Sequence, residues 1–227
     1  MNTCTCHSIF SRTFYSACLV LMVFAISTSF AAEGFDKIKA DLDSRDWEVR
    51  LAAVEKLNNL KEEKTIDLLM QIAGTRGEYW PVKIKAITLL GESADPKAVE
   101  MLLSIFNDPF NNWECPAIKS YTALALGYFK GNAKVVNSLI SGINDPELFT
   151  REASIQSLGR IGNPAAVLPL VAALNNDSSA VKLSAIKALE MIGDPQAIPH
   201  IQRIAENDND SVIKSQAKAA LNNFHKK

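Results

Sequence analysis

Apolar residues recur along this chain with the period of an α-helix, and the pattern is clearest over residues 181–201. Val181, Ala185 and Leu189 stand four residues apart, so they share one face of a predicted helix. The Gly-Asp-Pro run at 193–195 suits the end of one helix and the start of the next, because glycine enters the left-handed conformation freely and proline fits the first helical position. The stretch therefore predicts two helices joined by a tight turn, and neither helix can bury its apolar face alone.

The same helix pair recurs along the chain at intervals of 31 to 36 residues. Each copy is marked by an apolar residue or threonine followed by a basic residue, at Val49, Val82, Ile118, Thr150, Val181 and Ile213. Eight residues further on, each copy has a leucine: Leu57, Leu90, Leu126, Leu158, Leu189 and Leu221. Because a period of this length indicates stacked helix pairs, we predict an all-α solenoid (superhelix) of about six pairs without strands.

The predicted helices alternate between an outer and an inner layer. The outer helices are expected at residues 34–43, 65–73, 96–106, 134–140, 164–174 and 195–205. The inner helices are expected at residues 46–60, 80–92, 118–129, 146–161, 178–192 and 211–224. Pro169 and Pro199 stand about two turns into their outer helices, where proline normally kinks a helix.

Short motifs at the helix ends strengthen the repeat. Leucine precedes glycine at 90–91, 126–127 and 158–159, and aspartate or asparagine precedes proline at 95–96, 163–164 and 194–195. With Ile198-Pro199, these motifs resemble the HEAT-like repeats of the phycobilisome-lyase class, and the resemblance covers about residues 35–224. It implies an armadillo-like helical solenoid whose inner helices line a concave face and whose outer helices are bent at the prolines.

The first part of the chain has the composition of a secretory signal peptide. Arg12 is the one charged residue of residues 1–31, and an apolar run of ten residues at 17–26 leads to small residues that suit cleavage after Ala31. The run is too short to span a membrane, which takes about 20 apolar residues. We therefore expect export, most simply to the periplasm, and a single solenoid domain over residues 32–227.

Charge and cysteine content narrow the choice of partners. The formal net charge is −1, and removing the signal takes away one arginine and no acid. A chain so close to neutral has no bulk attraction for nucleic acid or an anionic membrane. Cys115 is the one cysteine outside residues 1–31, so no internal disulfide is expected. It is either a half-buried residue at a helix start, a reactive thiol or an intermolecular link, and we expect a monomer.

The basic residue of each repeat stacks into a column along the predicted solenoid. Its members are Arg50, Lys83, Lys119, Arg151, Lys182 and Lys214. An acid stands three to five residues before each, which favours a structural ladder in which acids cap the inner helices and meet the cations. The alternative is a cationic ridge that binds phosphates or an acidic partner.

Aromatic residues gather just before the inner helices. The three tryptophans are spaced 33 and 33 residues apart, and the predicted rim comprises Trp47, Tyr79, Trp80, Phe110, Trp113 and Phe149. A row of such rings could anchor a protein or peptide, since tryptophan and tyrosine dominate binding hot spots. The alternative is that each ring packs back onto its own helix as a hydrophobic staple.

Residues for catalysis or metal binding are not found. His200 and His225 are followed by Ile201 and Lys226, so the His-Glu pairs of deoxyhypusine hydroxylases are missing, and no phosphate-binding glycine loop or nucleophile–base set occurs. We predict a non-catalytic scaffold or adaptor that binds a protein or peptide with its concave face and aromatic rim, without cofactor, metal or nucleic acid. The alternative is an enzyme or enzyme subunit related to the bilin lyases or those hydroxylases.

Overall fold

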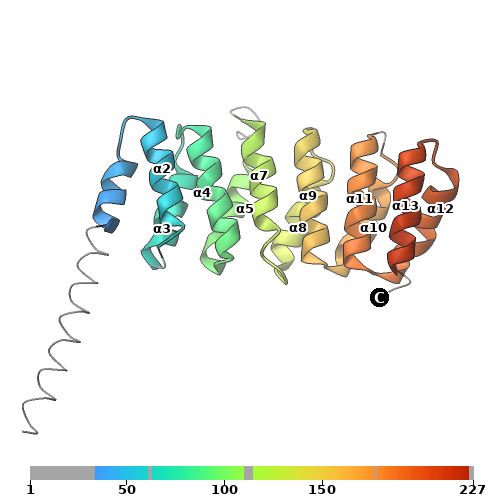
Figure 1. The fold of residues 1–227 in the computed structure, drawn as a ribbon. Coiled ribbons are helices and arrows are strands. Elements are labelled where there is room, and N and C mark those ends of the chain that lie inside the picture. Colours follow the sequence, from blue (N-terminus) through green and yellow to red (C-terminus); the bar gives the residue numbers. More distant parts are fainter. Residues whose placement is uncertain (1–33, 61–62, 110–114, 177, 225–227) are drawn as a thin grey trace, which may run out of the picture. The chain divides into compact units, whose positions relative to one another are not determined.

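The computed structural model describes residues 34–60, 63–109, 115–176 and 178–224 (Figure 1). The predicted signal peptide, residues 1–31, lies outside the described residues. The chain divides into two compact units, the first ending at Leu57 and the second beginning at Asn58. In the first unit, a helix over residues 34–42 precedes α2 (Trp47–Leu57), and Ile38, Ala53 and Leu57 are buried. A single domain over residues 32–227 stays a prediction.

The second unit is built from helices in two layers. Its inner helices are α4 (Trp80–Ser93), α7 (Pro116–Leu126), α9 (Leu148–Ile161), α11 (Ser179–Ile192) and α13 (Ser211–Phe224). Its outer helices are α3 (Glu63–Gly74), α5 (Val99–Asn107), α8 (Ala133–Gly142), α10 (Val167–Ala173) and α12 (Ile198–Asn207). Each inner helix packs against the next inner helix and against its outer partner (Figure 1). The described residues contain no strand, and the predicted all-α solenoid is confirmed.

The repeated leucines form the core between the layers. Leu90, Leu126, Leu158 and Leu189 have no exposed area, whereas Leu221 in the last inner helix is partly exposed. A leucine at the same position of every repeat faces both its own outer helix and the neighbouring pairs, so its burial depends on stacking. Leu221 lies in α13, which packs against α11 and α12 among the described helices.

The turns between inner and outer helices follow one design. Gly162 and Gly193 end α9 and α11 with φ of 75° and 74°, in the left-handed conformation that glycine adopts without strain. In the next turn, Asn163 and Asp194 accept a hydrogen bond from the backbone N–H two residues on, each at 2.9 Å. The turn after α4 has the same design, except that Ala94 takes the left-handed position with φ of 50°.

Pro169 and Pro199 lie nearer the start of their α-helices than the sequence predicts. A short 3₁₀ turn opens each of these outer segments, at Pro164–Ala166 and Pro195–Ala197, and the α-helix begins only after it. The two prolines therefore lie in the first turn of α10 and α12, where backbone N–H groups have no intrahelical partner to lose.

Glycines bring the inner helices unusually close. A Cβ added to Gly91 would lie 2.6 Å from the Cα of Ala125, and one on Gly159 would lie 2.8 Å from the Cα of Ala188. Gly127 approaches Ser157 in the same way. We call these contacts the glycine seam. It explains why a glycine follows the buried leucine in these three repeats, since any side chain there would push neighbouring inner helices apart.

Candidate functional site

Large apolar side chains that remain exposed gather on the inner layer of the second unit. Most lie on or beside inner helices: Tyr79, Trp80, Tyr121, Tyr128, Phe149, Met191 and Val212. Among the described residues of the outer layer, Leu168 alone is a large hydrophobic of this kind, with 67% of its surface exposed. We call the surface formed by the exposed side chains of α4, α7, α9 and α11 the inner-helix face. Exposed apolar groups on one face are typical of a binding surface.

A hollow of about 660 Å³ lies between α7 and α9. Small residues at positions 117, 120 and 153 leave the space, and Tyr121 and Phe149 line it with rings that are 43% and 72% exposed. Its polar lining includes Glu147, the N-cap residue of α9, and Glu152 one turn further along that helix. Cys115, a free and partly exposed thiol at the N-cap position of α7, also lines this α7–α9 hollow.

A second hollow of about 580 Å³ adjoins the first, between α9 and α11. The two share Glu152 and Gln156. The α9–α11 hollow adds the apolar side chains of Leu183 and Met191 and two cations, Arg160 and Lys187.

Both cations of the α9–α11 hollow have partners. The Arg160 guanidinium lies 4.7 Å from the centre of the Tyr128 ring and donates a hydrogen bond to the carbonyl oxygen of Leu124 at 3.2 Å. Lys187 Nζ lies 3.1 Å from a carboxylate oxygen of Glu190, one turn away on α11. The two hollows form one continuous surface through Glu152 and Gln156, and the charge of Lys187 on it is offset by Glu190.

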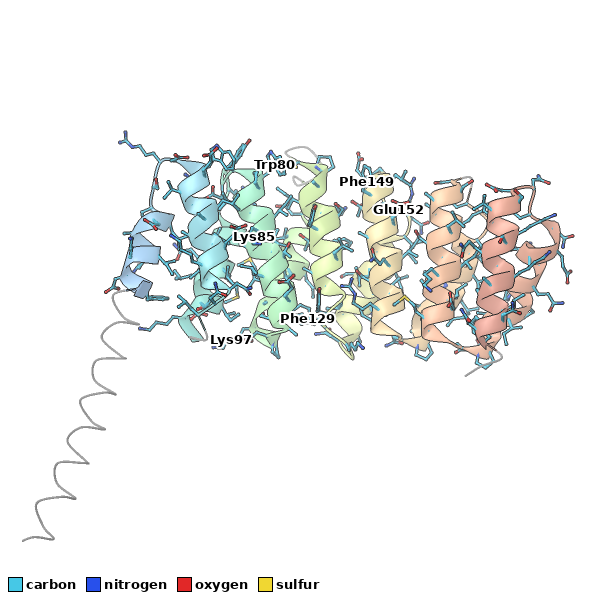
Figure 2. All side chains as sticks on the ribbon, viewed as in Figure 1. Trp80, Lys85, Lys97, Phe129, Phe149 and Glu152 are labelled. Atoms are coloured by element: carbon cyan, nitrogen blue, oxygen red, sulfur yellow. The ribbon has the colours of Figure 1, made fainter. Side chains whose placement is uncertain are left out.

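The predicted rim residues are only partly brought together. Tyr79 is the N-cap residue of α4 and Trp80 its first residue, with ring centres 6.0 Å apart. Phe149, the second residue of α9, lies at the same end of the inner layer as Trp80 and lines the α7–α9 hollow (Figure 2). Trp47 is the first residue of α2 in the other unit. Phe110 and Trp113 lie outside the described residues.

The arginines of the basic column bond to the turns before their helices. Arg151 Nη1 donates to the carbonyl oxygens of Asp145 and Pro146, at 2.8 and 3.0 Å. Arg50 does the same in the first unit with the carbonyl oxygens of Ser44 and Arg45, at 2.8 and 3.2 Å. The repeated contact holds the turn that leads into each of these inner helices.

The lysines of the column are largely shielded from solvent. Lys83 is buried and donates to the carbonyl of Thr75, while Lys119 pairs with Asp145. Lys182 Nζ lies 2.9 Å from a carboxylate oxygen of Asp208. Lys119 and Lys182 therefore join successive repeats, and none of these three lysines lies along an exposed ridge.

The remaining lysine of the column, Lys214, acts on the same carboxylate as Lys182. The backbone N–H of Asp210, the Lys182 ammonium and the charges of Lys182 and Lys214 together hold the pKa of Asp208 below its ordinary value, against a smaller opposing effect of burial. The column thus supplies electrostatic stabilisation to the turn before α13.

Within the described part of the chain, no group of three or more histidine, cysteine, aspartate or glutamate residues is arranged to hold a metal ion. In the same part, no helix has both the length and the apolar composition needed to cross a membrane. His200 lies on the outer helix α12, and His225 is outside the described residues.

Apart from Phe149 and Cys115, sequence reasoning missed the residues that line the hollows. Tyr121, Leu124 and Tyr128 stand three, six and ten positions after the repeat marker Ile118. The same offsets in the next two repeats give Ala153, Gln156, Arg160, Ser184, Lys187 and Met191. The side chains at these three offsets change in size and charge from repeat to repeat, whereas the leucine eight positions after the marker does not change. That contrast is the signal that could have found the lining residues.

The family follows from the sequence match and the fold together. HEAT repeats match residues 36–114, 111–180 and 150–222, so the chain belongs to the HEAT-repeat family. No curated protein sequence matches the chain.

Solved structures with this fold come from several sources. The complex of CpcE and CpcF of phycocyanin lyase from Nostoc sp. PCC7120 is similar at a TM-score of 0.57 and 22% identity, over 82% of this chain and 75% of that chain. A designed armadillo repeat protein in complex with the peptide (KR)4 is similar at 0.55 and 16% identity, over 83% and 98%. An archaeal HEAT-like repeats protein from Thermococcus onnurineus NA1 is similar at 0.54 and 16% identity, over 90% and 92%. At these identities the likeness establishes the fold alone.

Proposed function

We propose that the chain is a scaffold that binds a protein or peptide segment on its inner-helix face. The observation that carries this proposal is the pair of adjoining hollows that share Glu152 and Gln156. Open hollows lined by apolar side chains and a few polar groups suit a ligand that contributes side chains of its own. The designed armadillo repeat protein that was solved with a peptide supports a peptide as the occupant of such a fold.

The size of the surface suits a short extended segment. Neighbouring helices pack about 8–10 Å apart, so α7, α9 and α11 together span about 20 Å. An extended chain rises about 3.3 Å per residue, which gives a bound stretch of about six residues. The aromatic pair Tyr79 and Trp80 would extend the contact at one end of the inner layer, as an aromatic rim. With export of residues 32–227, the partner would be a protein of the periplasm.

A peptide library displayed on phage and selected on the full-length protein tests this proposal. Peptides that bind the wild type should lose most of their affinity for a Tyr121→Ala/Phe149→Ala variant. Leu168→Ala is the matched control, because it removes an equally exposed apolar side chain from the outer layer. Selected peptides that bind all three proteins equally would place binding elsewhere and overturn the assignment of the face. A Trp47→Ala/Trp80→Ala/Trp113→Ala variant tests the rim separately.

The enzyme alternative has a test of its own. A relative of the bilin lyases or deoxyhypusine hydroxylases would carry a chromophore or metal when purified. Visible absorbance or stoichiometric metal in the purified full-length protein would favour that alternative. Selected peptides that bind through Tyr121 and Phe149, from protein without either signal, would favour the scaffold.

A further inference from the structure

The two hollows of the inner-helix face differ in charge. Among the residues that the structure describes, the α7–α9 hollow is lined by the carboxylates of Glu147 and Glu152 and by no cationic side chain. The α9–α11 hollow has Arg160 and Lys187 in its lining beside the shared Glu152. An occupant that crosses both therefore meets two carboxylates between α7 and α9, and then Arg160 of α9 and Lys187 of α11, the latter paired with Glu190.

The carboxylates of the α7–α9 hollow have no cation of their own. Among the described residues, neither Glu147 nor Glu152 forms an ion pair or side-chain hydrogen bond. Two basic residues of the column, Lys119 and Arg151, are already bonded to Asp145 and to the carbonyl oxygens of Asp145 and Pro146. The negative charge of this hollow is therefore available to a ligand.

The aromatic lining adds a second means of recognising a cation. Phe149 and Tyr121 expose their rings in the same hollow as the two carboxylates. A guanidinium group can stack on such a ring while it donates hydrogen bonds to a carboxylate, and it does so better than an ammonium because it is planar and weakly hydrated.

A related arrangement, with a backbone carbonyl in place of the carboxylate, occurs within the protein beside this hollow. Arg160 of α9 stacks on Tyr128, the second residue beyond the end of α7, and donates to the carbonyl of Leu124. The space between α7 and α9 therefore already accommodates an arginine against a tyrosine. In the α7–α9 hollow the ring, the acceptors and the space are present, and an arginine from the protein is not among its lining residues.

We infer that the α7–α9 hollow receives an arginine side chain of the bound segment, with an apolar neighbour of that arginine directed to Leu183 and Met191 in the α9–α11 hollow. The guanidinium stacks on Phe149 or Tyr121 and pairs with Glu147 and Glu152. Lysine fits less well because its ammonium is strongly hydrated and cannot form the forked pair. This inference rests on the proposed function and specifies its ligand.

Three synthetic peptides test the inference with the full-length protein. They share the sequence Ac-Gly-Leu-X-Leu-Leu-Gly-amide, where X is arginine, lysine or citrulline, which keeps the shape of arginine without its charge. Isothermal titration should give a Kd for the arginine peptide about tenfold lower than that for the citrulline peptide, with the lysine peptide between them. Alkylation of Cys115, followed by mass spectrometry, gives a second readout, because a ligand in the hollow should protect this thiol.

A pair of charge-matched variants separates the site from overall charge. Glu147→Gln/Glu152→Gln should abolish the preference for arginine over citrulline. Glu100→Gln/Glu206→Gln removes the same charge from outer helices and should leave the preference intact, and both variants should keep the wild-type circular dichroism spectrum. These substitutions are on exposed or partly exposed residues, so loss of folding is not expected.

The outcomes distinguish the two proposals. Equal binding of all three peptides, with Cys115 protected, would overturn the arginine inference and leave a peptide-binding face. An arginine preference that survives in the Glu147→Gln/Glu152→Gln variant would also overturn it. Absence of binding by the three peptides, when library peptides bind through Tyr121 and Phe149, would overturn the inference alone. Absence of both kinds of binding would overturn the proposed function as well.

Discussion

The inner helices carry two surfaces, the glycine seam between neighbours and the inner-helix face that bears the hollows. Along the seam, the same contact recurs: a glycine of one helix meets a small residue of the next, as Gly91 meets Ala125 and Gly159 meets Ala188. Along the face, each repeat differs, with Tyr121, Ala153 and Ser184 at one matching position.

The residues that stabilise the stack, in the glycine seam, therefore differ from the residues that would select a partner, on the inner-helix face. A repeat protein can change its face without changing its fold, because each repeat contacts only its neighbours and the contacts between them lie in the seam and the leucine core. Substitutions in the seam should therefore change stability and substitutions on the face should change binding.

Breaking the seam should have the largest effect on stability. In Gly91→Ala the new Cβ would lie 2.6 Å from a backbone atom of Ala125, which cannot rotate away. Neighbouring inner helices would have to move apart, and we expect the free energy of unfolding to fall by about 3 kcal/mol. Urea denaturation followed by circular dichroism measures this loss as a lower midpoint.

Gly127→Ala provides a graded control for the seam. Its new Cβ would lie 2.7 Å from Ser157 Oγ, which can move to another rotamer, and 2.9 Å from Ser157 Cβ, which is relieved only by a small shift of the helix. The move would break the 2.8 Å hydrogen bond from Ser157 to the carbonyl of Ala123, so we expect a loss of about 2 kcal/mol. Wild-type stability in Gly91→Ala would contradict the close approach of the helices.

We expect the basic column, like the glycine seam, to stabilise the fold and not to bind the partner. Asp208, the partner of Lys182, tests this assignment. In Asp208→Asn the Lys182 ammonium loses a charged partner at 2.9 Å, and we expect a loss of about 1.5 kcal/mol at pH 7. Peptide binding on the inner-helix face should not change. A variant that weakens binding while keeping wild-type stability would place the column in the binding surface instead.

The pH dependence of stability provides a further test of the contacts of Asp208. The folded-state pKa of Asp208 is lower than its unfolded value, so its ionised form stabilises the folded state above the unfolded pKa. That stabilisation is lost as the pH falls below about 4, through the lowered folded-state pKa. The stability difference between wild type and Asp208→Asn should therefore shrink on acidification and remain constant from pH 5 to 7.

Most of the fold could be predicted because the same apolar pattern occurs in every repeat. The predicted inner helix at 178–192 is observed at Ser179–Ile192, and the predicted one at 211–224 is observed at Ser211–Phe224. The different position of Pro169 within its helix has a physical cause. The apolar pattern marks a helical segment but does not distinguish 3₁₀ from α hydrogen bonding in its first turn, and that choice decides whether the proline falls inside the helix or at its start.

The candidate site was harder to predict because its side chains come from neighbouring repeats. The tryptophan spacing is visible along the sequence and predicts an aromatic rim. The α7–α9 hollow instead joins Tyr121 of one repeat to Phe149 and Glu152 of the next, beside small residues that leave space. Which side chains meet there depends on the rotation of two packed helices, and the repeat period by itself does not give that rotation.

The turn after α4 offers a smaller test of the repeated scaffold. Ala94 takes a left-handed conformation that the equivalent Gly162 and Gly193 adopt without strain. Ala94→Gly should raise the free energy of unfolding by about 0.5 kcal/mol, since relief of strain outweighs the greater freedom of glycine in the unfolded chain. Gly193→Ala is the reciprocal control and should lower it by about 1 kcal/mol. A loss of stability in Ala94→Gly, measured by urea denaturation, would contradict strain at this turn.

The smallest expected change in stability is on the face, at Phe149. Its ring is 72% exposed at the start of α9, so Phe149→Ala should change the free energy of unfolding by less than about 0.5 kcal/mol. Peptides selected on the wild type should nevertheless bind this variant at least about tenfold more weakly, because the ring lines the α7–α9 hollow. Strong destabilisation by Phe149→Ala would show instead that the ring packs on its own helix as a hydrophobic staple. Phe149 would then belong with the residues that stabilise the fold and not with the binding surface.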